Sequence, residues 1–169
     1  VPGVEADDVI GTLAKMAEVA GETVLISTGD KDLAQLVTAK VTLVNTMSDT
    51  TLTPAGVSEK FGVPPERMID FLALTGDSVD NVPGIPKCGP KTAAKWLNAY
   101  GTLDGVVASA NDIGGKIGET FRYHMHVLPL SKALVTIKTD CELPVGLEEL
   151  SRSDPDLERL TALYTELEL

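Results

Sequence analysis

The chain has 169 residues, of which 43% are hydrophobic and only 4% aromatic, and its formal net charge is −11. This length fits one domain with a small appendage, and the hydrophobic content is sufficient for an aliphatic core. No apolar run reaches the roughly 18 residues that a membrane-spanning helix needs, and no basic-then-apolar leader opens the chain. Cys88 and Cys141 are too few and too far apart for a disulfide framework or a zinc site. We therefore expect no membrane association and a reducing, cytoplasmic location.

The negative charge is distributed unevenly. Residues 1–80 have a net charge of −8, residues 81–138 of +4, and residues 139–169 of −7. A basic middle between two acidic ends suits a protein that grips a polyanion with one part and collects cations with another.

The first predicted element is a helix over residues 5–20, where apolar side chains recur at helical spacing. A buried strand follows at 23–27, then a short helix at 32–37 and a second strand at 41–45. This order predicts an α/β fold with a parallel sheet. Because sheets usually have about 4–6 strands, we interpret a two-stranded sheet as incomplete and expect that the N-terminal part of the domain is absent.

From Pro54 onward the pattern predicts helices and no further strand. The expected helices span 54–61, 65–75, 90–100, 102–109, 117–126, 128–136 and 155–167. The last of them has leucines at helical spacing, which we expect to pack on the core while its charged side chains face water.

Three acidic clusters stand out in the first 80 residues. They read Glu5-Ala6-Asp7-Asp8, Asp30-Lys31-Asp32 and Asp77-Ser78-Val79-Asp80. Each cluster alone is also typical of a helix start or a turn. Brought together, the carboxylates would repel one another unless hard divalent cations such as Mg²⁺ bound between them. Two such ions about 3.5–4 Å apart can activate a water and stabilise the leaving oxygen of a phosphodiester.

The segment 82–97, which reads VPGIPKCGPKTAAKWL, places a tight turn between two helices. Its glycines can adopt positive φ and let a backbone come close. The helix after the turn can offer its free N–H groups to phosphates, and the lysines add attraction that depends on salt. The candidates for binding a nucleic-acid backbone are Gly84, Ile85, Lys87, Gly89, Lys91, Thr92 and Lys95. Trp96 lies in an apolar stripe, and we expect it in the core. Lys116 and Arg122 could extend the same surface.

These motifs resemble a known family. The residues that carry the resemblance are Val4–Gly11, Ser27–Asp32, Asp70–Gly84 and Ile137–Asp140. They look like the 5′→3′ exonuclease domain of bacterial DNA polymerase I, which belongs to the flap-endonuclease superfamily, and the match runs in order over nearly the whole chain. The resemblance implies hydrolysis of DNA near a 5′ end, flap or nick, in replication and repair. It also implies two Mg²⁺ or Mn²⁺ ions, a bacterial cytoplasmic location and a polymerase domain linked in the full-length protein.

The resemblance also implies roles for individual residues. Carboxylates that match the first metal site are Glu5, Asp7 and Asp8, and those that match the second are Asp30, Asp32, Asp77 and Asp80. Asp7 would lie between the two ions, and all of these aspartates are catalytic candidates. The segment 84–95 matches a helix-hairpin-helix motif that holds duplex DNA and in relatives can hold K⁺ through backbone carbonyls. The parts we expect are an α/β core portion (1–82), a helical hairpin subdomain (83–140) and a C-terminal helical segment packed on the core (141–169).

Two departures from the family pattern matter. The family usually has glycine where this chain has Lys87, so a positive φ there would strain this residue. The family also has a further segment before Glu5, with another strand, other metal-binding aspartates and a basic arch. We therefore expect this chain alone to fold marginally and to cleave weakly or not at all. Two other functions remain open, namely a non-catalytic fragment that grips DNA and a Mg²⁺-dependent phosphatase of small phosphate esters.

Overall fold

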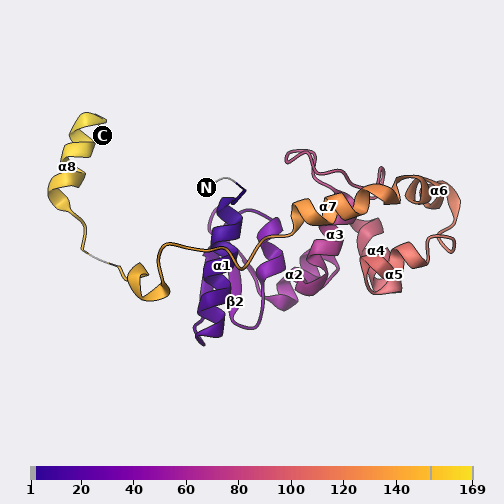
Figure 1. Ribbon diagram of the computed structural model, residues 1–169, viewed down its shortest axis with the longest axis horizontal. Helices are drawn as coiled ribbons and strands as arrows, with labels where there is room; N and C mark the ends of the chain where they lie inside the picture. Colours follow the sequence, from indigo (N-terminus) through magenta and orange to yellow (C-terminus); the bar gives the residue numbers. More distant parts are fainter. Residues whose placement is uncertain (1–2, 153, 169) are drawn as a thin grey trace.

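A small three-stranded sheet lies left of the centre of the molecule, in the purple part of the ribbon (Figure 1). In the computed structural model, which describes residues 3–152 and 154–168, its strands lie in the order β1 (Val24–Ser27), β2 (Val41–Asn45) and β3 (Thr50–Leu52). The β1–β2 pair is parallel, and the β2–β3 pair is antiparallel. The mixed α/β class and the parallel pair are confirmed. The sequence pattern does not predict β3, because three residues are too few to show an alternation.

The helices expected from the sequence are all present, some with a 3₁₀ turn in place of an α-helical one. In chain order they are α1 (Ala6–Val19), η1 (Asp32–Leu36), α2 (Pro54–Phe61), η2 (Pro65–Arg67), α3 (Met68–Thr75), α4 (Pro90–Tyr100), α5 (Leu103–Ala108), α6 (Gly115–His124), η3 (Met125–Val127), α7 (Leu128–Val135), η4 (Leu147–Leu150) and α8 (Leu157–Glu166). Across the described ranges, none of them is both long and apolar enough to cross a membrane.

Helix α3 is the centre of the core. Its buried apolar residues, Met68 and Phe71 to Leu74, are at most 3% exposed, Ile69 is partly buried, and the helix packs against α4, α7 and η1. Its one buried carboxylate belongs to Asp70. This carboxylate accepts hydrogen bonds from the backbone N–H of Leu103 at 3.0 Å and from Nζ of Lys132 at 3.0 Å. Asp70 thereby ties α3 to the start of α5 and to α7.

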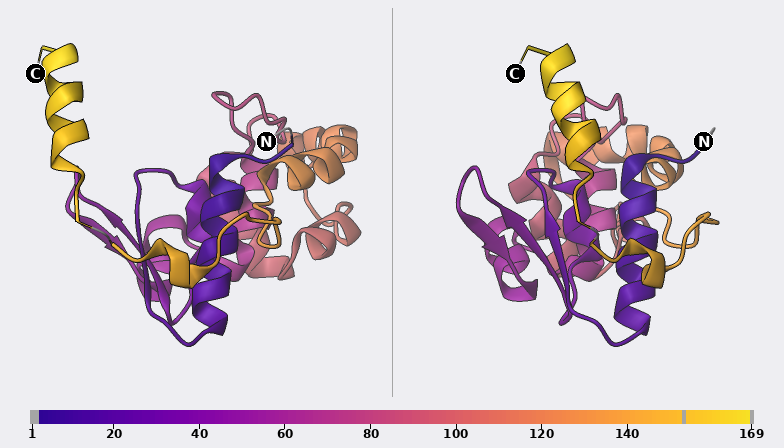
Figure 2. Two further views of the ribbon diagram at one scale, coloured as in Figure 1. Left: turned by 60° about the vertical axis from the view of Figure 1, so that its left-hand side comes forward. Right: turned by 90° about the vertical axis from the view of Figure 1, so that its left-hand side faces the viewer.

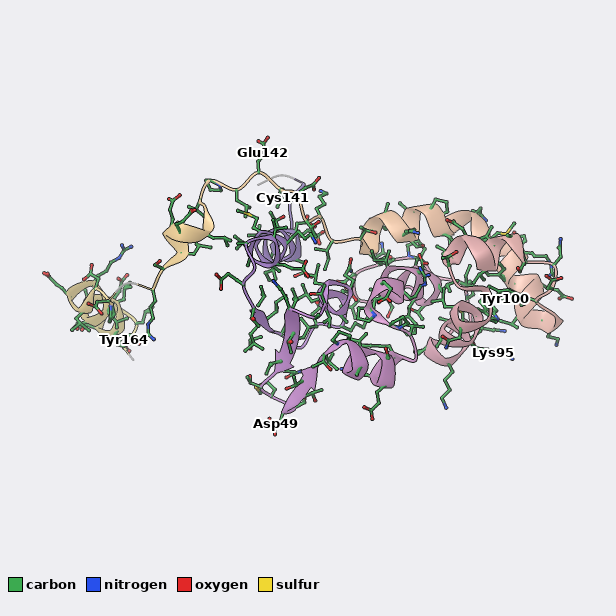
Figure 3. All side chains as sticks on the ribbon, turned by 90° about the horizontal axis from the view of Figure 1, so that it is seen from below. Asp49, Lys95, Tyr100, Cys141, Glu142 and Tyr164 are labelled. Atoms are coloured by element: carbon green, nitrogen blue, oxygen red, sulfur yellow. The ribbon has the colours of Figure 1, made fainter. Side chains whose placement is uncertain are left out.

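After α7 the chain runs back across the molecule and passes beside α1. The side chain of Thr12 on α1 accepts a hydrogen bond from the backbone N–H of Cys141 at 3.1 Å, and Figure 3 shows Cys141 next to that helix. This return brings residues 136–141 against the first two turns of α1, where the first acidic cluster lies.

Helix α8 stands apart from the rest of the molecule in Figure 1 and in the left-hand view of Figure 2. None of its described residues is buried, and Leu157 and Leu163 are 67% and 42% exposed. The expectation that these leucines pack on the core is therefore wrong. Helical spacing predicts an amphipathic helix, but it does not determine which surface the apolar stripe meets.

Candidate functional site

Asp8, in the first turn of α1, has both carboxylate oxygens engaged by the protein. Oδ1 accepts the backbone N–H of Lys138 at 2.8 Å, and Oδ2 accepts the backbone N–H of Glu5 at 3.1 Å. The Lys138 N–H, ahead of the Glu5 N–H, holds the pKa of Asp8 below its ordinary value. The side chain is 7% exposed. Asp8 therefore fixes the start of α1 to the segment that returns after α7.

Asp7 points toward the other acidic loops. It lines a cavity of about 330 Å³ together with Asp32 and the returning residues 133–138. Partial burial raises its pKa most, followed by the negative charge of Asp30, with a smaller contribution from Asp80. The negative charges of the second and third acidic clusters thus reach Asp7 in the first cluster.

Asp32 begins η1, just beyond the carboxyl end of β1. Its backbone N–H donates to Oδ1 of Asp30 at 2.9 Å, which shapes the loop between strand and helix. Its own Oδ1 is buried and has no hydrogen-bond partner among the described residues. Burial, with the nearby charge of Asp30, raises the pKa of Asp32 to about 6. Among the described residues Asp32 forms no ion pair, and the charge of Lys31 offsets only part of the effect that burial and Asp30 have on its pKa.

The third acidic cluster lies in a closed loop after α3. The backbones of Asp77 and Val82 exchange hydrogen bonds of 3.0 and 2.7 Å, and Oδ1 of Asp77 accepts the N–H of Val79 at 2.7 Å. Oδ2 of Asp77 forms an ion pair with Lys31, which lowers the pKa of Asp77 more than the Val79 N–H does. Asp80, in the same loop, is exposed.

This loop depends on two glycines. A Cβ atom built on Gly84 would lie 2.5 Å from the backbone N of Gly76, and one built on Gly76 would lie 2.6 Å from the N of Gly84. Neither position has room for a side chain, so the chain can cross itself here only with glycine at both positions. This crossing joins the acidic loop directly to the hairpin that follows.

The acidic side chains match a hard divalent cation in donor type, because carboxylate oxygens are the ligands that Mg²⁺ and Mn²⁺ take. The unpartnered oxygen of Asp32 and the raised pKa of Asp7 are the signs expected of carboxylates gathered to hold a cation. Within residues 3–152 and 154–168, however, no three acidic, histidine or cysteine side chains are placed to hold one ion. The three acidic clusters lie near one another, but their carboxylates are not directed at a common ion position.

The hairpin is anchored by Ile85. This side chain is 2% exposed, and its backbone N–H donates to the carbonyl of Leu74 on α3 at 2.9 Å. Gly84 and Gly89 do not have the positive φ that the sequence suggests for them, and φ of Gly89 is −80°. The residue with positive φ is Lys87, at 67°, so the conformation that favours glycine is present at this position.

The basic side chains of the hairpin are open to solvent. Lys87, Lys91 and Lys95 are exposed, and a Cβ atom built on Gly89 would meet nothing within 4 Å. A shallow groove of about 560 Å³ runs from Asp77 along the hairpin to Gly89. Figure 3 places Lys95 at the end of the molecule opposite to α8. The basic surface and the third acidic loop are therefore continuous.

Trp96 and Arg122, near this end of the molecule, are both engaged by the protein itself. Trp96 is 5% exposed and packs edge-on against Phe121 with ring centroids 5.1 Å apart, as predicted for a core residue. Arg122 donates from Nη1 to the carbonyls of Ala110 and Ile113 at 2.7 and 3.1 Å, so its guanidinium group holds the turn before α6.

Sequence reasoning missed the partners that hold the carboxylates. Lys31 stands out between two aspartates, but nothing in the pattern pairs it with Asp77, which lies 46 positions away. Likewise, no local signal connects Asp8 with Lys138. Both contacts depend on how loops distant in sequence meet in the folded chain.

The sequence matches the model of a known family in two parts. Residues 1–62 match the family described as 5′-3′ exonuclease, N-terminal resolvase-like domain, and residues 63–158 match the one described as 5′-3′ exonuclease, C-terminal SAM fold. These parts meet ahead of the boundary at residue 82 that the sequence suggests. The division at 82 and 140 stays a prediction.

Individual relatives agree with this family. The chain is 49% identical to DNA polymerase I of Pseudomonas aeruginosa over 99% of its own length and 19% of that protein. It is 46% identical to the thermostable DNA polymerase I of Thermus filiformis, again over 99% of its length and 20% of the relative. The chain thus spans about a fifth of the length of these relatives. A solved structure of the bacteriophage T5 flap endonuclease, with 22% sequence identity, has the same fold, with a TM-score of 0.74 over 82% of this chain and 52% of that one.

Proposed function

Since the chain belongs to the 5′-3′ exonuclease family, we propose that it hydrolyses DNA phosphodiesters near a 5′ end, at a flap, a nick or a duplex terminus, in replication and repair. The observation that supports this most is the meeting of three acidic loops beside a basic hairpin. Asp7 comes from the first turn of α1, Asp30 and Asp80 come from two loops, and both loop carboxylates are close enough to affect the pKa of Asp7. The groove along the hairpin begins at Asp77.

The carboxylates would hold two divalent ions, Mg²⁺ or Mn²⁺. Glu5 and Asp7 would bind the first ion. The aspartates of the other two acidic clusters would bind the second, namely Asp30, Asp32, Asp77 and Asp80. When bound, such ions lower the pKa of a water and neutralise the leaving oxygen of the phosphodiester. The T5 flap endonuclease structure contains metal ions and DNA, which supports this assignment. Asp8 would contribute by holding α1 in place, since its two oxygens already accept backbone N–H groups.

The hairpin would hold the duplex backbone. Gly84 and Ile85 keep the turn against α3, and Gly89 leaves open space for a phosphate at the start of α4. Lys87, Lys91 and Lys95 would neutralise phosphates without reading sequence, while Thr92 lies half-buried in the first turn of α4. A K⁺ ion held by the carbonyls of the turn would add to the same interaction.

The relatives suggest which domain accompanies this chain in the full-length protein and where the protein works. Because the chain covers about a fifth of DNA polymerase I proteins, we infer that the full-length protein carries a polymerase domain on the same chain and works in the bacterial cytoplasm. The nuclease would then act on strands that the polymerase meets.

A second function has one observation in its favour. The hairpin is fully formed, whereas the described carboxylates do not converge on one ion, so a fragment that grips DNA without cutting it is the alternative. In that case Asp30→Ala and Asp77→Ala would leave DNA binding unchanged and no cleavage would be measured for the parent chain.

The experiment that tests the proposal measures cleavage of an end-labelled 5′-flap duplex with Mg²⁺ and with EDTA, alongside turnover of a small phosphate ester. Cleavage of the flap duplex that EDTA abolishes is expected, at a low rate if this chain alone cleaves weakly, as its sequence suggests. A phosphatase would instead turn over the small ester, and Lys91→Ala and Lys95→Ala would leave that turnover unchanged. Such a result would overturn the nuclease proposal.

A further inference from the structure

We propose that Lys31 is a built-in counter-ion of Asp77, and that its ammonium group must leave Asp77 before a divalent cation can be held there. The inference rests on the proposed function, because it concerns the same acidic loops. Lys31 lies between Asp30 and Asp32, and its Nζ donates to Oδ2 of Asp77. Among the ion pairs of the described residues, this is the one that joins two of the acidic loops.

Asp77 already has a protein donor on each oxygen. Oδ1 accepts the N–H groups of Val79 and Asp80 at 2.7 and 3.3 Å, and Oδ2 is taken by Lys31. The Asp77 side chain is 12% exposed, so few directions of approach remain. A cation that approaches Oδ2 therefore meets an ammonium group in the position that it would occupy itself.

One ammonium group does only part of what a divalent cation would do. It offsets a single charge, while the negative charges of three carboxylates act on it, those of Asp77, Asp32 and Asp30. Mg²⁺ carries two charges and takes several oxygens at about 2.0–2.1 Å. This difference in charge and in number of bound oxygens explains two features of the described residues: no three carboxylates converge on one position, and Oδ1 of Asp32 has no hydrogen-bond partner.

Lys31 can leave without disturbing the core. Its side chain is 44% exposed, and it is a flexible stem with a strongly hydrated head. The pair is exposed on the lysine side only, so water solvates the ammonium group when it leaves Asp77. The exchange of Lys31 for a divalent cation therefore needs only a side-chain movement, whereas the loop around Asp77 is already held by its own backbone hydrogen bonds.

Calorimetric titration of Mn²⁺ into the whole chain tests the inference. Lys31→Met removes the competing ammonium group, and we expect it to tighten Mn²⁺ binding by about fivefold, as an exposed ion pair of this type allows. Lys31→Arg keeps the charge and should bind Mn²⁺ as the parent does. The matched control is Lys60→Met, because Lys60 lines a small pocket with Asp30 and Lys31 but makes no ion pair with a described acidic residue.

These titrations distinguish a failure of the inference about Lys31 from a failure of the proposed function. If Lys31→Met binds Mn²⁺ no more tightly than Lys60→Met, the lysine does not compete and the inference is overturned while the metal site stands. If none of the proteins binds Mn²⁺, the proposed function is overturned and the inference with it.

A second readout follows the ammonium group itself. In a Mg²⁺ titration monitored by NMR, the chemical shift of Lys31 Cε should change with the same midpoint as that of Asp77 Cγ. The chemical shift of Lys60 Cε should not change. A Lys31 signal that stays constant while Asp77 responds would show that the ion pair survives metal binding, which contradicts the proposal.

Discussion

The backbone N–H of Lys138 donates to Oδ1 of Asp8 at 2.8 Å, although 130 positions separate the two residues. The contact closes the chain on itself, because Asp8 opens α1 and Lys138 follows α7. Because Asp8 is held in this way, the position of its sequence neighbour Asp7 is also fixed. The architecture of the acidic site thus depends on a segment from the far end of the chain.

Asp8→Ala should lower the free energy of unfolding by about 2 kcal/mol, because two partly buried hydrogen bonds from backbone N–H groups lose their charged acceptor. Urea unfolding measures this loss. Glu59→Ala is the control, since Glu59 is exposed on α2 and makes no hydrogen bond or ion pair among the described residues. Equal midpoints for the two variants would show that the Asp8 contacts contribute nothing to stability.

Asp32 should make stability fall as the pH rises from about 4 to about 6. Its pKa is raised from 3.8 to about 6 in the folded chain, so the folded state binds a proton in this window that the unfolded state has released. The contribution of Asp32 is fully present below about pH 4 and is lost as the pH passes 6.

Asp32→Asn isolates this effect from groups such as Asp8 and Asp77, whose lowered pKa values act in the opposite direction. The variant and the parent should be equally stable near pH 4, and the variant should be more stable at pH 7. Urea unfolding at the two pH values provides the comparison. A difference between variant and parent that does not change with pH would contradict the assignment.

Lys87→Gly should raise the free energy of unfolding by about 0.5–1 kcal/mol, because φ of Lys87 is 67° and glycine adopts this conformation without steric strain. Lys87→Ala retains the strain and serves as the control. Thermal unfolding of the two variants distinguishes them. If glycine is no more stable than alanine here, the positive φ is not strained.

The same two variants should weaken duplex binding to a similar extent. Each removes one phosphate contact, so the slope of log affinity against log salt should become shallower by about 1, as it should for Lys91→Ala. Fluorescence anisotropy at several salt concentrations measures the slope. An unchanged slope for all three variants would place the DNA elsewhere on the molecule.

Asp70→Ala should destabilise the chain by about 2 kcal/mol or more, because the carboxylate is buried and accepts two hydrogen bonds that link three helices. Lys132→Met removes only one of these donors, whose side chain is 44% exposed, and should cost about 1 kcal/mol or less. Chemical denaturation of both variants tests the order, and a larger loss for Lys132→Met would contradict it.

The sequence predicts the elements well because their signals are local. The helical period of α1, the proline that begins α4 and the apolar run of β1 each appear within a few positions. The expected burial of that strand is wrong, however, because only Ile26 is buried and Leu25 is 66% exposed. The same holds for the three acidic clusters and for the glycine-bearing hairpin. The position of α8 could not be predicted in this way, because its leucines indicate an apolar face without indicating a partner.

The contacts inside the site could not be predicted for a related reason. Lys31 and Asp77 meet because the loop after β1 and the loop after α3 approach the same edge, which depends on the packing of α3. For Lys87 the sequence predicts only that a positive φ would cause strain. It does not predict φ itself, because a lysine at a position where the family usually has glycine can adopt either sign.

The central claim is that the acidic loops cut DNA that the hairpin holds, and single-turnover cleavage of an end-labelled 5′-flap duplex tests it most directly. With protein in saturating excess and Mg²⁺ present, the parent and Lys91→Ala should cleave at similar rates, since excess protein offsets weaker binding. Asp77→Ala should be at least about a hundredfold slower, as expected when a group that stabilises the transition state is lost. Cleavage by Asp77→Ala at the parental rate, or binding without cleavage by the parent chain, would contradict the claim.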